Sequence, residues 1–151
     1  MSATAVREHL ERILNTMGIR ADIEERSLPD LSMPYVNLLT DEARFLIGSR
    51  ARTLYALEYL LRRLAERQVG GDRPNFFLDV NGYRYHQLEE LKTEVKNVAK
   101  KVRLYRNGIM LKPMSPFERR IVHMALAEYP DITTQSVGEG ESRRVVIKPY
   151  P

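Results

Sequence analysis

An arginine and a histidine in the last third of the sequence are spaced to act together. Arg119 and His123 are four residues apart, and Ser115–Glu118 (Ser-Pro-Phe-Glu) has the pattern of a capping box with proline in the first turn. That pattern predicts a helix, on which residues four apart lie on one side. A guanidinium binds phosphate through a planar fork, and an imidazole stacks on a base or donates a hydrogen bond. The pair therefore predicts a site for single-stranded nucleic acid.

The remaining residues of this predicted helix indicate which side faces the protein interior. Phe117, Ile121, Met124 and Ala125 recur at helical spacing and are expected to pack on a core, with Val122 extending the apolar side. The side with the two basic residues is then expected to face water or a ligand.

A second candidate site is the segment Gly48–Arg52 (Gly-Ser-Arg-Ala-Arg). It separates two predicted helices, and its glycine lets a sugar-phosphate backbone come close. The amides at the start of the following helix can bind phosphate, and Arg50 and Arg52 add positive charge. By itself such a turn is common, so its meaning depends on the elements around it.

Hydrophobic periodicity predicts two α+β units. For residues 1–81 we expect helices at 4–17, 42–47 and 52–68 and strands at 20–26, 34–40 and 76–80, the first two strands forming a hairpin. In the third strand, Phe76, Leu78 and Val80 alternate with Phe77 and Asp79, which predicts one buried and one exposed face. The order is αββααβ.

For residues 82–151 we expect a long helix at 84–105, a strand at 109–112, a helix at 116–128 and two strands at 132–137 and 143–148. The order is αβαββ, and the two units are joined through the long helix. The fold class is therefore α+β, with a domain of residues 1–81 followed by a domain of residues 82–151.

Composition and charge restrict the function classes. The chain has 151 residues and no cysteine, so disulfides and thiolate-metal sites are excluded, and its three scattered histidines do not suggest a metal site. Residues 1–81 carry 11 basic and 12 acidic side chains, whereas residues 82–151 carry 13 and 8. The positive charge is concentrated in the second unit, as expected of a polyanion binder.

Both units resemble known RNA-binding families. The first, with Gly48–Ala51 between its helices, resembles a KH domain of the second topological type, whose Gly-x-x-Gly loop holds about four nucleotides of single strand; Ala51 stands where that family has its second glycine. Lys112–His123 and Arg143–Ile147 resemble the single-strand-binding domain family named for the Arg-x-x-x-His motif. The two in succession resemble the Jag family of bacterial RNA-binding proteins, and Phe45–Gly48, Thr53–Leu60 and Leu78–Val80 match its pattern too.

The resemblance implies a cytoplasmic, non-enzymatic protein that binds RNA, with single-stranded DNA as a second ligand, and acts as a post-transcriptional regulator or RNA chaperone. It implies no cofactor, metal, small-molecule substrate or membrane insertion. Family members often carry an extra N-terminal domain, which we do not expect here. The expected nucleic-acid contacts are Arg119, His123, Arg120, Lys112, Arg143 and Arg144 in the second unit and Gly48, Ser49, Arg50, Ala51 and Arg52 in the first.

Two other readings stay open at this point. Arg119 and His123, with Glu118 nearby, have the residue types of a phosphodiesterase acid/base set, although no second base is positioned. Alternatively, the chain is a protein-interaction adaptor in which both nucleic-acid sites are vestigial.

Overall fold

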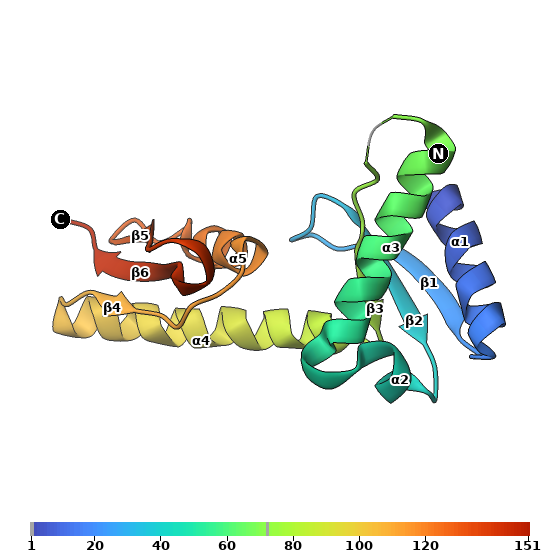
Figure 1. Cartoon of the computed structure of the whole chain (residues 1–151). Coiled ribbons are helices and arrows are strands. Elements are labelled where there is room, and N and C mark those ends of the chain that lie inside the picture. Colours follow the sequence, from blue (N-terminus) through green and yellow to red (C-terminus); the bar gives the residue numbers. More distant parts are fainter. Residues whose placement is uncertain (1, 72) are drawn as a thin grey trace. The chain divides into compact units, whose positions relative to one another are not determined.

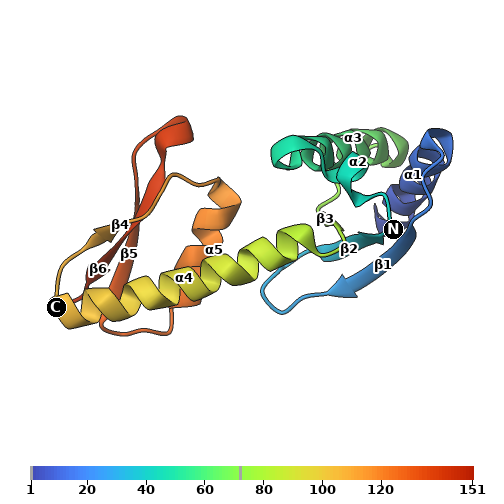
Figure 2. The same ribbon diagram turned by 90° about the horizontal axis from the view of Figure 1, so that it is seen from below.

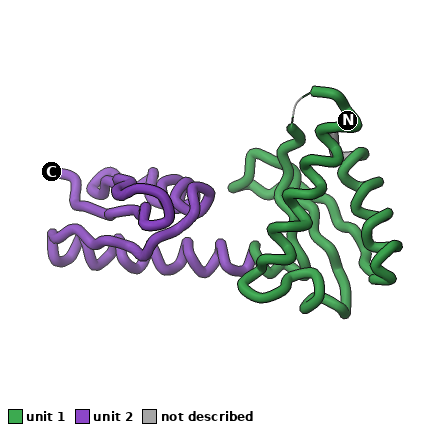
Figure 3. Tube along the Cα trace, viewed as in Figure 1, with its two compact units in different colours: residues 1–84 green, residues 85–151 purple. Residues whose placement is uncertain are grey.

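The computed structural model describes residues 2–71 and 73–151, which fall into two compact units, residues 1–84 and 85–151 (Figures 1 and 3). The first contains α1 (Ser2–Met17), β1 (Asp22–Ser27), β2 (Pro34–Leu39), α2 (Ala43–Ile47), the 3₁₀ turn η1 (Ser49–Ala51), α3 (Arg52–Val69) and β3 (Phe77–Val80). Next come α4 (Tyr83–Tyr105), β4 (Ile109–Met110), α5 (Pro116–Leu126), β5 (Ile132–Val137), the 3₁₀ turn η2 (Gly140–Ser142) and β6 (Arg144–Pro149). The predicted mixed α+β class and both predicted element orders are observed.

The first unit is a three-stranded sheet with helices on one side (Figure 2). β2 is the central strand, antiparallel to β1 in the expected hairpin and parallel to β3. Alternate strand residues pack with α1 and α3 because side chains on one face of a strand recur every second residue. This core contains Leu10, Leu14, Val36, Leu38, Leu54, Leu61, Leu78 and Val80.

The other face of β2 and β3 is also buried, so the predicted exposed face of β3 is wrong. The Tyr35 hydroxyl donates to Asp79 Oδ2 at 2.8 Å, and the Tyr35 and Phe77 rings stack with centroids 5.9 Å apart. The Arg84 guanidinium lies 3.8 Å from the Phe77 ring centroid and 2.5 Å from Glu58 Oε2. Strand alternation predicted which residues share this face, but the arginine that covers Phe77 comes from the start of the next helix.

The second unit is a three-stranded antiparallel sheet with β6 between β4 and β5. One face packs on α4 and α5. Its core contains Val95, Ala99, Val102, Val122, Leu126, Val145 and Ile147. None of the described helices in the chain is long and apolar enough to cross a membrane.

The start of α5 is the predicted capping box. The Glu118 amide donates to Ser115 Oγ at 3.2 Å, and the Ser115 amide donates to Glu118 Oε2 at 2.8 Å. Each side chain satisfies an amide that the first helical turn leaves without a partner. The box determines where the helix begins, and thus the register of every residue after it.

The buried side of α5 differs from the predicted one. Ile121, Val122 and Leu126 are buried, whereas Met124 is 49% exposed, so the expectation that Met124 packs in the core is wrong. At about 100° per residue, the buried arc runs from Ile121 through Val122 to Leu126 and leaves Met124 outside it. Arg119 and His123 consequently lie at the border of the buried arc, and both are half-buried.

Candidate nucleic-acid interface

The His123 side chain reaches from α5 to the edge strand β5 (Figure 1). Its Nδ1 lies 2.5 Å from Thr134 Oγ1, and its Nε2 lies 3.1 Å from Ser136 Oγ. Thr134 and Ser136 are two residues apart and therefore project from the same face of the strand. Both polar atoms of the imidazole are thus engaged by hydroxyls of the same unit.

The charge state of His123 follows from these surroundings. Burial lowers its pKa below the usual 6.5, and the positive charge of Arg119 lowers the pKa further. At neutral pH the imidazole is therefore uncharged, with one nitrogen donating and the other accepting a hydrogen bond. The hydroxyls of Thr134 and Ser136 can rotate to serve either tautomer.

Arg119 and Arg143 line the same surface pocket, of about 670 Å³, in the second unit. Arg119 Nη1 donates to the Met114 carbonyl at 2.7 Å, and Arg143 Nη1 donates to the Gly138 carbonyl at 2.7 Å. Neither guanidinium forms an ion pair within the described part of the chain, although Glu141 also lines the pocket. The carbonyls orient the two forks without neutralising them, which leaves two positive charges beside one cavity.

Three other predicted contacts are not part of this pocket. Lys112 and Arg120 are exposed and have no hydrogen bond or ion pair among the described residues. Arg144 precedes the buried Val145 on β6, so it points to the opposite face of the sheet, away from α5. The expectation that Arg144 lines the groove with Arg119 is therefore wrong, because a one-residue step along a strand reverses the face.

The segment between α2 and α3 requires glycine at its first position. Gly48 has φ +73°, and a Cβ there would lie 2.2 Å from Thr53 Oγ1 and 2.9 Å from Thr53 Cβ. A side chain at this position would be strained by its backbone conformation and would collide with the start of α3. The close approach of Thr53 thus explains the glycine without any ligand.

The other residues of this segment divide into exposed and buried. Ser49, Arg50 and Arg52 are exposed, and neither arginine has a polar partner among the described residues. Arg50 and Ala51 both adopt left-handed backbone, with φ of 53° and 59°. Ala51 is 4% exposed and belongs to the core of the first unit, so its methyl group is directed inward. The exposed rim of the segment is therefore basic.

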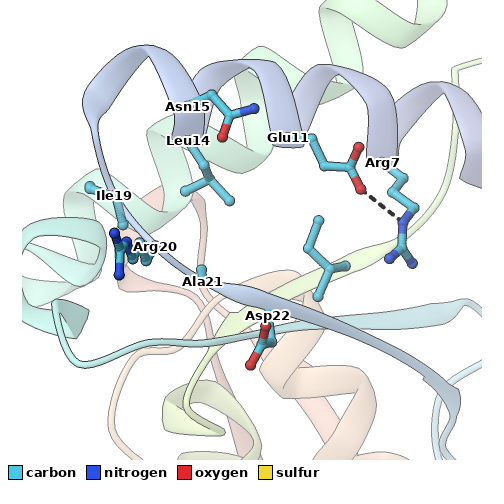
Figure 4. A pocket seen from close by; sticks show the side chains of 9 residues that line it. Arg7, Glu11, Leu14, Asn15, Ile19, Arg20, Ala21 and Asp22 are labelled. Atoms are coloured by element: carbon cyan, nitrogen blue, oxygen red, sulfur yellow. Dashed lines mark hydrogen bonds and ion pairs between the residues drawn. The ribbon is translucent and has the colours of Figure 1, made fainter.

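A further pocket, of about 560 Å³, lies between α1 and β1 (Figure 4). Arg7 and Arg20 line it together with Glu11 and Asp22, and Arg7 Nε lies 3.1 Å from Glu11 Oε1. Its charges are balanced, and none of the predicted contacts lies in it. No group of three or more acidic, histidine or cysteine side chains suited to a metal ion occurs in the described residues.

Sequence reasoning missed the two hydroxyls that hold His123. Ile132, Thr134 and Ser136 share a face of β5, and Ile132 is buried. Two hydroxyl side chains on a face that begins with a core residue were a readable signal, because polar groups on such a face need a partner. The partner itself, on a different element, was not readable.

Comparison with known proteins connects this geometry to named families. Residues 88–149 match the domain family named for its Arg-x-x-x-His motif. The chain is 36% identical over 140 residues to the RNA-binding protein KhpB of Clostridium symbiosum, a match that covers 93% of this chain and 63% of that protein. It is 38% identical over 109 residues to the RNA-binding protein KhpB of Bacillus subtilis, covering 71% of this chain and 52% of that protein.

A third relative extends the similarity to almost the whole chain. The RNA-binding protein KhpB of Lactiplantibacillus plantarum is 32% identical over 149 residues, covering 95% of this chain and 45% of that protein. The chain thus spans from under half to just under two thirds of the length of these curated relatives. The predicted resemblance is confirmed at the level of the family.

Proposed function

Because this chain belongs to the Jag family, with an Arg-x-x-x-His domain at residues 88–149, we propose that it binds single-stranded RNA without catalysing a reaction on it. In this proposal Arg119 and Arg143 bind backbone phosphate and His123 contacts the adjoining nucleotide. Lys112 and Arg120 add positive charge at the edge. The cellular role would be that of a cytoplasmic post-transcriptional regulator or RNA chaperone, and single-stranded DNA would be a weaker ligand.

The observation that carries the proposal is the pair of guanidiniums beside one pocket. Arg119 and Arg143 are each oriented by a backbone carbonyl at 2.7 Å. A fork held by a neutral acceptor keeps its full charge and still has N–H groups free to donate to phosphate. A purely structural arginine is more often paired with a carboxylate, which these two are not within the described residues.

We further propose that residues 1–81 are a KH-like domain and residues 82–151 a separate nucleic-acid-binding domain. The order αββααβ supports the first assignment, as does the tight turn at Gly48. The exposed rim Ser49, Arg50 and Arg52 would then contact the sugar-phosphate backbone, with Gly48 and Ala51 shaping the turn. The inward direction of the Ala51 methyl leaves this rim accessible.

The site supports binding more than phosphodiester cleavage. An acid/base catalyst needs a nitrogen or carboxylate that can exchange a proton with the substrate. Both nitrogens of His123 are bonded to Thr134 and Ser136, and the Glu118 carboxylate accepts from the Ser115 amide at 2.8 Å. Neither group is placed to take up that role.

A gel-shift experiment with end-labelled single-stranded RNA tests the proposal. The intact chain should retard the RNA without shortening it. The double variant R119A/H123A should weaken binding about tenfold or more, because it removes a charge-assisted contact and an aromatic ring. The matched control R67A/H86A removes the same two residue types from exposed helix positions and should bind normally. Shortened RNA would indicate a nuclease, and no retardation would indicate an adaptor.

A further inference from the structure

The hydrogen bonds of His123 restrict what this side chain can offer to a ligand. A hydrogen bond to an imidazole nitrogen lies near the plane of the ring, where the N–H bond or lone pair points. With Thr134 at one nitrogen and Ser136 at the other, the edge of the ring that carries both nitrogens lies against β5. A phosphate could reach a nitrogen only by displacing one of these hydroxyls.

The two faces of the ring remain. Thr134 and Ser136 are two residues apart along β5, so the plane of the ring follows the strand and its faces are directed across the sheet. β5 is an edge strand next to β6. One face of the ring is therefore directed over β6 and the other past the edge of the sheet, and the side chain is only half-buried.

We propose that Thr134 and Ser136 are positioning residues that occupy both ring nitrogens of His123, so that the ring binds an unpaired base by stacking on its face. This inference rests on the proposed RNA binding and names the part of the RNA that each side chain recognises. Arg119 and Arg143 take the phosphate, and His123 takes the base next to it. Stacking on an aromatic face tolerates any base, so this contact selects for single strands and not for a sequence.

The charges around His123 agree with this division. The groups that face its ring are the two uncharged hydroxyls of β5, and the charged group that acts on it from α5 is Arg119. No carboxylate stabilises an imidazolium there, and Arg119 opposes one. A neutral ring stacks as well at pH 8 as at pH 7, so RNA affinity should not increase when His123 first begins to take up a proton.

Substitutions of His123 in the full chain separate stacking from phosphate binding. The probe is a short fluorescein-labelled oligouridylate, compared with the same strand carrying abasic sites. H123A should weaken oligouridylate binding by about 5- to 150-fold, the range for loss of one stacked base. H123F should restore most of the affinity, whereas H123K should not. The slope of log affinity against log salt should equal that of the unchanged protein in H123A and H123F.

The abasic strand provides a second, independent readout. The unchanged protein should bind it more weakly than oligouridylate, and H123A should bind both strands equally, because the base and the ring are then each other's only loss. H123K binding as tightly as the unchanged protein would overturn the inference. So would a salt slope that becomes less negative by about 0.7 in H123A, which is the change expected for one lost phosphate contact.

The positioning role is tested on β5. T134V/S136A removes both hydroxyls and should reduce the discrimination between oligouridylate and the abasic strand, while T134S should retain it because its hydroxyl remains. Equal discrimination in the unchanged protein and T134V/S136A would refute the positioning role. If T134V/S136A does not fold, the comparison of H123F with H123K still decides whether the ring stacks. Failure of the unchanged protein to bind any single strand would instead refute the proposed function, and this inference with it.

Discussion

Replacing Arg119 by alanine should weaken RNA binding far more than it weakens the fold. The guanidinium uses one N–H for the Met114 carbonyl at 2.7 Å and has no carboxylate partner among the described residues. A hydrogen bond to a charged group contributes about 1.5–3 kcal/mol, which corresponds to roughly 10- to 150-fold in affinity. If that group is one phosphate of a single strand, the salt slope should become less negative by about 0.7.

The loss of folding stability should be small. R119A removes the bond to the Met114 carbonyl, which is worth about 1 kcal/mol, and water can replace the guanidinium at this half-buried position. For a chain of this length, about 1 kcal/mol lowers the melting temperature by roughly 2–4 °C. Most of the protein should therefore remain folded where binding is measured.

The assay is fluorescence anisotropy with labelled oligouridylate at salt concentrations from about 50 to 200 mM. R67A, which removes an exposed arginine from α3, controls for the change in net charge. R119K keeps the charge without the planar fork, so it should keep the salt slope and lose part of the affinity. Equal salt slopes for R119A and R67A would refute the assignment of a phosphate to Arg119.

Three further predictions concern the fold. G48A should destabilise the first unit by about 2–5 kcal/mol in urea denaturation, since it adds backbone strain and a clash, whereas G18A, with φ +71° and no atom within 4 Å of its Cβ, should lose only about 1 kcal/mol. E58A should lose about 3–5 kcal/mol because it leaves the buried Arg84 charge without its partner, and R84M/E58L should recover much of that loss. Thermal stability should fall as pH drops below about 6.5, since the unfolded chain then takes up a proton that native His123 resists. An unchanged pH profile in H123F would contradict that source.

Local patterns in the sequence predicted the elements well. The capping box at Ser115 and Glu118 joins residues three positions apart, so its geometry depends on little else. The hairpins and the helical repeats follow from the same short-range rules. The proposed pair Arg119 and His123 was readable for this reason, because four-residue spacing on a helix places two side chains together wherever the helix packs.

The orientation of those elements was less predictable. The apolar pattern of α5 allowed a core side centred on Phe117 and Ile121, but packing selected the side centred on Val122. A helix with several apolar residues has more than one side that can be buried, and the partner elements decide among them. This rotation brought His123 to β5 and made it half-buried.

Short-range patterns in the chain were sufficient to place the helices and strands, to group residues on shared faces, and to set a guanidinium and an imidazole one turn apart. Packing of the complete fold was needed to bring both nitrogens of His123 to hydroxyls of β5, to join Arg143 with Arg119 at one pocket, and to turn Arg144 to the opposite face of the sheet. The physical reason is range. Backbone hydrogen bonds and side-chain periodicity act within a few residues, whereas burial and polar partners depend on residues brought together from distant parts of the chain.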